Sequence, residues 1–217
     1  MKQILTAILF DLDGTLADTI ADLANATNWM LEQLGCPTHP MASYRHMVGD
    51  GARNLCTRAL PPDKLHLLDD AIRMFRQRYG EHCFDLTALY PGMADLVAKL
   101  HASGYKLAVL SNKPDDFTKK TIAYYFKSCP FDLVRGQLPG GPLKPDPAAA
   151  LAIATELRVP PDQWLYLGDT NTDMRTARAA GMFSVGVLWG FRDREELMAS
   201  GAQELIATPA EVWRLLR

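Results

Sequence analysis

The sequence lacks the features that mark several large classes of protein. Its apolar run at the N-terminus, Ile4 to Phe10, is too short to cross a bilayer and carries no small-residue cleavage pattern, so we expect neither a membrane protein nor a secreted one. The formal net charge is -2 over 217 residues, with no block of like charges, which gives no electrostatic attraction to nucleic acid. A Walker-type loop is absent, and Gly49-x-Gly51 lacks the rest of a dinucleotide-binding fingerprint.

Cysteine is scarce, and its spacing points to no disulfide framework or zinc site. The four cysteines are widely scattered, with no Cys-x-x-Cys and no His-paired zinc spacing: Cys36, Cys56, Cys83 and Cys129. Reduced, mostly buried thiols in a cytoplasmic protein are the simplest interpretation. The composition, 48% hydrophobic and 22% charged, is that of an ordinary globular enzyme. We therefore expect a cytoplasmic protein that binds neither nucleic acid nor a membrane.

Helices and strands alternate along most of the chain. The branched and aromatic run 4–10 predicts a buried strand, and from Tyr90 onward apolar runs of strand length are separated by stretches of helical spacing. We predict further strands at 106–110, 131–134, 164–167, 183–187 and 204–206, and helices at 91–103, 113–126, 147–157, 172–180, 194–200 and 209–216. Repeated strand-helix-strand units imply a parallel sheet with helices on both faces.

The segment between the first strand and this alternating region has a different pattern. Helices are predicted at 19–34, 51–60 and 63–82, and no strand is predicted between residues 15 and 85. We therefore predict an α/β fold: a Rossmann-like core made of residues 1–14 and 87–217, and an inserted helical cap made of residues 15–86.

Polar side chains follow three of the predicted strands. Asp11 and Asp13 follow the first strand, Ser111 follows the strand that ends at Leu110, and Asp169 and Asp173 follow the strand that ends at Leu167. In an open α/β sheet, ligands bind beyond the carboxyl ends of the strands. A lone Asp after a strand is usually a turn former or a helix cap, but three such ends at one edge favour a functional site.

Such a group of carboxylates predicts a particular chemistry. The carboxylates would repel one another unless a cation lay among them, and Mg²⁺ prefers carboxylates together with phosphate oxygens. A carboxylate that attacks phosphorus forms an acyl phosphate, and a second carboxylate two positions along could act as acid and base.

The motifs in this sequence resemble those of the haloacid dehalogenase superfamily. The segment Asp11-Leu12-Asp13-Gly14-Thr15-Leu16-Ala17-Asp18 is similar to its first motif, and Ser111 is similar to the second. Lys144 in Lys144-Pro145-Asp146-Pro147 and the segment Gly168-Asp169-Thr170-Asn171-Thr172-Asp173 resemble the third and fourth. The resemblance covers essentially the whole chain and implies a helical cap inserted after the first motif.

The resemblance implies roles for the acidic residues. Asp11 would be the nucleophile and a Mg²⁺ ligand. Asp13 would be the acid and base, with its backbone carbonyl on the metal. Asp169 would bind Mg²⁺ directly, and Asp173 would bind it or orient its waters. Dehalogenases in this superfamily typically lack an Asp at the position of Asp13, which argues against that branch, whereas sugar phosphomutases share the Asp pair.

The resemblance also implies how the phosphate is held. Ser111, with the amide of Asn112, would bind the transferring phosphoryl oxygens, and Lys144 would neutralise charge around the nucleophile. These implied roles complete a phosphatase site of seven core residues.

The predicted cap holds the features that bear on the substrate. The segment Met47-Val48-Gly49-Asp50-Gly51-Ala52-Arg53-Asn54-Leu55 is similar to the specificity segment of bacterial phosphoglycolate phosphatases. Gly51 would allow close backbone approach to a small ligand, and Arg53 could pair with a substrate carboxylate. The alternative is that Arg53 is solvated on an exposed helix face. Asp50 would disfavour an anion unless it points away.

We therefore expect a magnesium-dependent phosphatase, a monomer or homodimer, acting on a small phosphorylated metabolite, with 2-phosphoglycolate as the first candidate. A sugar phosphate, a nucleotide and pyrophosphate are the other candidate substrates. A sugar phosphomutase and a catalytically silent binding or regulatory protein are the alternatives from other classes.

Overall fold

The structure, a computed structural model, describes residues 4–127 and 131–216, and its centre is a parallel sheet. Six strands lie in the order β5-β4-β1-β6-β7-β8, and every neighbouring pair is parallel. Their bounds are β1 (Ala7–Phe10), β4 (Lys106–Pro114), β5 (Leu133–Gln137), β6 (Trp164–Gly168), β7 (Phe183–Val187) and β8 (Glu204–Ile206). The predicted α/β fold with a helical insertion is confirmed.

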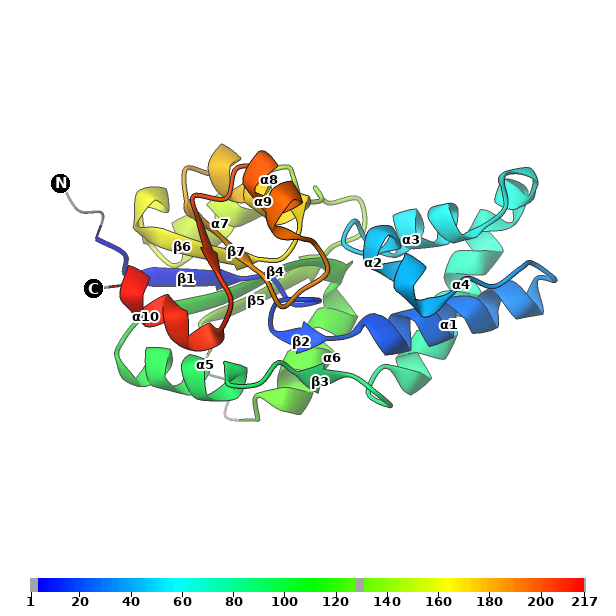
Figure 1. Cartoon of the computed structure of the whole chain (residues 1–217), viewed down its shortest axis with the longest axis horizontal. Coiled ribbons are helices and arrows are strands. Elements are labelled where there is room, and N and C mark those ends of the chain that lie inside the picture. The colour runs from blue at the N-terminus through cyan, green and yellow to red at the C-terminus, as the bar shows by residue number, and fades with distance from the viewer. Residues whose placement is uncertain (1–3, 128–130, 217) are drawn as a thin grey trace.

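Both faces of the sheet are covered by helices, as Figure 1 shows. Side chains alternate along the central strand β1, so Ile8 and Phe10 pack into one apolar cluster while Ala7 and Leu9 pack into another. The first cluster includes residues of α5 (Met93–Ala102), α6 (Asp115–Tyr125) and α10 (Val212–Leu215). The second includes residues of α7 (Ala148–Glu156) and α8 (Asn171–Ala179), and α9 (Arg194–Ala199) packs on α8. Burial on both faces explains why the strands read as nearly continuous apolar runs.

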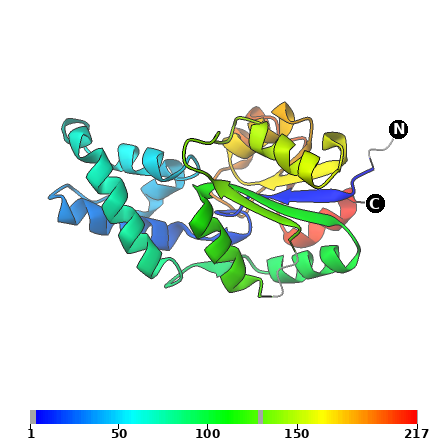
Figure 2. The same cartoon turned by 180° about the vertical axis from the view of Figure 1, so that it is seen from behind.

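The inserted helices form a separate layer beyond the carboxyl ends of the strands (Figures 1 and 2). They are α1 (Ile20–Gln33), α2 (Tyr44–Met47), α3 (Ala52–Ala59) and α4 (Leu68–His82). These helices, the cap, bury an apolar cluster around Tyr44, Phe75 and Tyr79. Phe117 of α6 and Phe191, both outside the cap, pack into the same cluster, so apolar contacts help to hold the cap on the core.

The prediction that no strand occurs between residues 15 and 85 is wrong. Strand β2 (Ala17–Asp18) pairs antiparallel with β3 (Ala88–Leu89), and this ribbon joins cap and core. A strand of two residues is too short to show any hydrophobic periodicity, so the sequence pattern could not reveal it. The predicted domain boundaries fall within three residues of this ribbon and stay a prediction.

Other predicted elements differ only at their ends. The predicted helix 63–82 begins as a 3-10 helix, Pro62–Leu67, and α4 starts at Leu68. The predicted strand 106–110 extends to Pro114, with an irregularity in its register between Leu110 and Pro114.

Two expectations from composition can be compared with the described residues. Cys36, Cys56 and Cys83 are buried and free, and Cys129 lies outside the described residues. Within residues 4–127 and 131–216, none of the helices has the length and apolar character needed to cross a membrane.

Candidate active site

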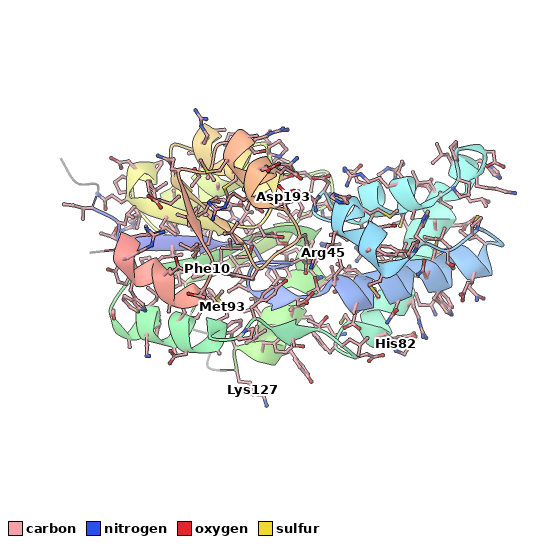
Figure 3. The ribbon with its side chains drawn as sticks, viewed as in Figure 1. Phe10, Arg45, His82, Met93, Lys127 and Asp193 are labelled. Atoms are coloured by element: carbon pink, nitrogen blue, oxygen red, sulfur yellow. The ribbon has the colours of Figure 1, made fainter. Side chains whose placement is uncertain are left out.

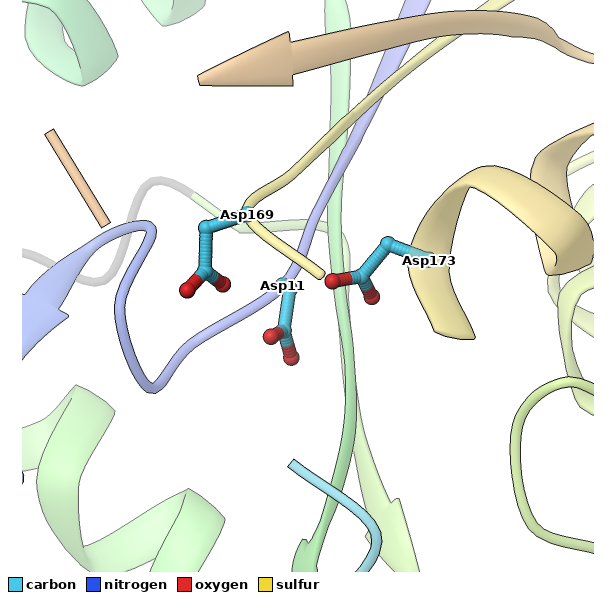
Figure 4. A group of neighbouring side chains, drawn as sticks. All are labelled: Asp11, Asp169 and Asp173. Carbon is cyan, nitrogen blue, oxygen red and sulfur yellow. The ribbon is translucent and has the colours of Figure 1, made fainter. Parts of the chain in front are cut away.

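Three buried aspartates meet at the carboxyl ends of the central strands (Figure 4). Asp11 follows β1, Asp169 follows β6, and Asp173 lies in the first turn of α8. One carboxylate oxygen from each lies within 4.8 Å of the other two. The neighbouring strands β1 and β6 therefore bring these residues together where their positions after the strands predict them.

The electrostatics of this cluster are unfavourable for three negative charges. Burial, followed by repulsion from Asp173, raises the pKa of Asp11 from 3.8 to about 7, although Lys144 opposes the change. Burial, followed by repulsion from Asp173 and Asp11, raises the pKa of Asp169 well above its usual range. The buried Lys144 ammonium lies 2.7 Å from Asp11 Oδ1 and 2.7 Å from Asp173 Oδ1. One ammonium cannot neutralise three carboxylates, so negative charge is left over.

This donor set fits Mg²⁺. Asp11 Oδ1 has the Lys144 ammonium beside it but accepts no well-directed hydrogen bond, so it retains free lone pairs. Asp169 is held in place by the Thr15 hydroxyl, which donates to Oδ1 at 3.1 Å, and by the Phe191 amide, which donates to Oδ2 at 2.8 Å. A divalent cation would remove the repulsion that raises the pKa values of these carboxyl groups. Asp11 and Asp169 are therefore suited to direct ligation.

Asp173 is more fully hydrogen-bonded than the other two. Its Oδ2 accepts hydrogen bonds from the amide and hydroxyl of Thr170, at 3.0 and 2.7 Å, which is the capping box that starts α8. Its Oδ1 accepts from Lys144 and, at 3.2 Å, from the Tyr166 hydroxyl. Four hydrogen bonds to one carboxylate favour the second of the two predicted roles, in which Asp173 orients metal-bound water.

Gly14 allows the first loop to approach the cluster. Its φ is +86°, and a Cβ placed there would lie 2.1 Å from Asp169 Oδ2. Both the backbone conformation and the space therefore require glycine.

Asp13 is bound to a lysine whose role the sequence did not suggest. Lys113 Nζ lies 2.9 Å from Asp13 Oδ1 and 3.2 Å from Oδ2, and it donates to the Tyr79 hydroxyl at 2.7 Å. Burial alone would lower the pKa of Lys113, but Asp13 and Tyr79 raise it above its usual range. Lys113 is therefore a buried cation that links Asp13 in the core to α4 in the cap. The signal in the sequence was its place two residues after Ser111, in the segment Ser111-Asn112-Lys113-Pro114, which is similar to the corresponding segment of bacterial phosphoglycolate phosphatases.

Ser111 and Asn112 lie in the irregular part of β4, where a disrupted ladder re-aims side chains. Both are buried and face the cavity described below. The Asn112 side chain accepts from the Lys144 amide at 2.8 Å and donates to the Gly49 carbonyl at 3.0 Å. It therefore connects the third motif with the cap.

A cavity of about 40 Å³ lies between the cap and the core. Asp11, Asp13, Ser111, Asn112 and Lys113 form its polar side. The apolar wall combines cap and core side chains: Leu23, Val48, Leu55, Phe75 and Phe117. Cap and core together therefore enclose the cavity.

The two predicted cap residues have different positions. Gly51 lines the cavity, and a Cβ there would lie 3.2 Å from the Asn112 carbonyl oxygen. The Arg53 side chain is 67% exposed, 3.3 Å from Asp69, and does not line the cavity. This arrangement matches the solvated alternative for Arg53. Asp50 does not line the cavity: its carboxylate pairs with Arg58 and accepts a hydrogen bond from the Thr172 hydroxyl.

Three core residues hold the segment 45–50 of the cap. Besides the Asn112 bond to Gly49, the Thr172 hydroxyl donates to Asp50 Oδ1 at 2.9 Å. Arg192 donates to the carbonyl of Arg45 and, at 3.1 Å, to that of Val48. Figure 3 shows Arg45 at the boundary between cap and core. We call these three core residues, Asn112, Thr172 and Arg192, the clamp. Asn112 lines the cavity itself. Thr172 precedes Asp173, and Arg192 follows Phe191, whose amide donates to Asp169.

Comparisons with known proteins agree with this arrangement. A family profile described as haloacid dehalogenase-like hydrolase matches residues 8–187. The chain is 36% identical over 190 residues to a phosphoglycolate phosphatase of Pseudomonas putida, covering 85% of this chain and 70% of that protein. It is 34% identical over 217 residues to a phosphoglycolate phosphatase of Chromobacterium violaceum, covering 97% of this chain and 96% of that protein. A crystal structure described as a candidate phosphoglycolate phosphatase from Lactobacillus delbrueckii subsp. bulgaricus is similar, with a TM-score of 0.91 at 30% identity, covering 100% of this chain and 99% of that one.

Proposed function

Because the chain belongs to the haloacid dehalogenase-like hydrolase family, as a phosphatase of the phosphoglycolate phosphatase type, we propose that it hydrolyses 2-phosphoglycolate in a Mg²⁺-dependent reaction through a phosphoaspartate at Asp11. The observation that carries the proposal is the buried cluster of Asp11, Asp169 and Asp173 beside Lys144. It combines a nucleophile with the charge neutralisation that phosphoryl transfer requires.

The chemical roles follow from the contacts. The Asp11 carboxylate attacks phosphorus, forming the acyl phosphate, while the bond from phosphorus to the ester oxygen breaks. Asp13 gives its proton to that leaving oxygen, which departs as the alcohol of glycolate. Asp13 then takes a proton from the water that attacks phosphorus, releasing inorganic phosphate and restoring Asp11. Mg²⁺ held by Asp11, Asp169 and the Asp13 carbonyl would supply the positive charge that lets a carboxylate approach an anionic phosphoryl group.

Other residues of the chain position these groups. Lys144 favours the charged form of Asp11 and so opposes burial, which favours the protonated form. Ser111 lies on the polar side of the cavity, within reach of a phosphoryl group held over Asp11. The closed cap excludes bulk water, which strengthens these interactions.

The choice of 2-phosphoglycolate is supported by size and by similarity. The cavity is small and one of its sides is apolar, which suits a two-carbon leaving group better than a nucleoside. The Pseudomonas and Chromobacterium relatives carry the name phosphoglycolate phosphatase.

The experiment that tests the proposal is phosphate release with Mg²⁺ from 2-phosphoglycolate, sugar phosphates, nucleotides and pyrophosphate. We expect the highest kcat/KM for 2-phosphoglycolate, loss of activity in EDTA, and loss of activity in Asp11→Asn. A higher kcat/KM for another phosphorylated compound would overturn the proposed substrate but leave the proposed phosphatase reaction in place. Isomerisation of a sugar phosphate with little phosphate release would identify a mutase instead. Mg²⁺ binding without any turnover would indicate a silent fold.

A further inference from the structure

We propose that Lys113 recognises the carboxylate of the substrate, and so selects phosphomonoesters that carry a second anionic group one carbon from the ester oxygen. The inference rests on the proposed phosphatase function and names the residue that determines its specificity. It assigns to a core lysine the task that the sequence pattern assigns to Arg53 in the cap.

Lys113 is the cation that faces the substrate. Among the described residues that line the cavity, it alone carries a positive charge. Its side chain is 3% exposed, and the apolar rings of Phe75 and Phe117 line the same cavity. An ion pair formed in such surroundings is weakly screened and therefore strong. Arg53 lies outside the cavity.

The position of Lys113 matches the length of the substrate. In 2-phosphoglycolate a single CH₂ group separates the ester oxygen from the carboxylate. The group that protonates the ester oxygen and the group that binds the carboxylate must therefore be neighbours. Asp13 and Lys113 are neighbours, since Nζ lies 2.9 Å from Asp13 Oδ1.

The ammonium can accommodate a ligand by exchanging its weakest contact. Its three N–H donors have three acceptors within reach: the two Asp13 oxygens, at 2.9 and 3.2 Å, and the Tyr79 hydroxyl, at 2.7 Å. A substrate carboxylate in the cavity would take the donor of the longest contact, the one to Asp13 Oδ2, and leave the other two in place. The Tyr79 ring, 4.6 Å from Nζ, fixes the ammonium further. Because Tyr79 belongs to the cap, the recognition site is complete when the cap is closed.

The experiment compares two substrates that differ only in the recognised group. These are 2-phosphoglycolate and 2-hydroxyethyl phosphate, in which a CH₂OH group replaces the carboxylate. The ratio of their kcat/KM values is measured for the wild type, Lys113→Gln, Lys113→Arg and Arg53→Gln. Lys99→Gln is the matched control, because Lys99 is 62% exposed on the core helix α5.

We expect Lys113→Gln to reduce the preference for 2-phosphoglycolate by about 10- to 100-fold, the effect of losing one charge-assisted hydrogen bond. Hydrolysis of both substrates slows in this variant, because Lys113 also positions Asp13. The test therefore uses the ratio of the two kcat/KM values and not either value alone. Lys113→Arg keeps the positive charge and retains most of the preference. Arg53→Gln leaves the ratio unchanged, and Lys99→Gln leaves both rates unchanged.

Several outcomes would overturn the inference. If Lys113→Gln slows both substrates equally, Lys113 only positions Asp13. If Arg53→Gln loses the preference instead, the cap arginine binds the carboxylate. If Lys113→Gln is too slow to assay, the two ligands are compared by calorimetric binding to Asp11→Asn with and without the Lys113 change, and an unchanged ratio of Kd values counts against the inference. Failure of the proposed function looks different, because the wild type itself would then release no phosphate from 2-phosphoglycolate.

Discussion

Asp11 offers a test of the site that needs no substrate, because its pKa links the stability of the metal-free protein to pH. The pKa rises from 3.8 to about 7, chiefly through burial and next through Asp173. A carboxyl group with a raised pKa binds its proton more tightly in the folded state. Its contribution to stability is therefore fully present below about pH 4 and is lost as pH rises to about 7.

The magnitude follows from the size of this change. Each pKa unit corresponds to about 1.4 kcal/mol, so the full effect is about 4 kcal/mol, of which about 3 kcal/mol falls between pH 5 and pH 8. The variant Asp11→Asn removes the titrating group and keeps the shape of the side chain. In EDTA, we expect the free energy of unfolding of the variant, relative to that of the wild type, to rise by about 3 kcal/mol from pH 5 to pH 8.

The assay is urea denaturation across this pH range, with and without Mg²⁺. Asp69→Asn is the control, because the Asp69 side chain is 91% exposed, and its difference from the wild type should not change with pH. Mg²⁺ should stabilise the wild type more at pH 8 than at pH 5, and Asp11→Asn less than the wild type. A difference between Asp11→Asn and the wild type that stays constant from pH 5 to pH 8 would refute the description of Asp11 as a buried, repelled carboxylate.

Three further substitutions test how the site is held. Gly14→Ala places a Cβ against Asp169, and we expect at least a 100-fold loss of kcat with loss of Mg²⁺-induced stabilisation in thermal melts; normal activity would contradict the close approach. Arg192→Gln removes charge-assisted hydrogen bonds to the cap, so kcat/KM should fall about 10- to 100-fold with faster amide exchange in residues 44–50, and unchanged exchange would count against the clamp. Tyr166→Phe removes one hydrogen bond to Asp173 and should cost about 1 kcal/mol in urea denaturation, whereas equal or higher stability would show that the bond contributes nothing.

Much of the fold could be predicted because its signals are local. The apolar runs that became β1, β6 and β7 are bounded by polar turns, and a helix such as α5 buries residues at helical spacing: Met93, Leu96, Val97 and Leu100. The ribbon of β2 and β3 could not be predicted. A strand of two residues shows no hydrophobic periodicity, and the paired residues lie about 70 positions apart in the sequence.

The sequence likewise predicted some residues of the candidate site and missed others. Asp11 and Asp169 follow apolar strands, so their meeting at one edge of the sheet could be anticipated from the topology of parallel strands. The contacts of Lys113 and Arg192 could not, because each depends on how the cap docks against the core. Arg53 shows the reverse case: its place in the first turn of a helix suggested an anion site, but the direction of its side chain is set by the cap's tertiary packing.

The clamp has a consequence for how such enzymes could change their substrates. Asn112 and Arg192 bind main-chain carbonyl groups of the cap, those of Gly49, Arg45 and Val48, and every amino acid carries such a carbonyl. The cap side chains that face the cavity can therefore be exchanged, by mutation or by design, while the core still donates hydrogen bonds to the same main-chain carbonyl groups. Closure and selectivity are thus separable traits in this fold, and a library that varies Leu55 and Phe75 should yield altered substrate ranges from enzymes that still close.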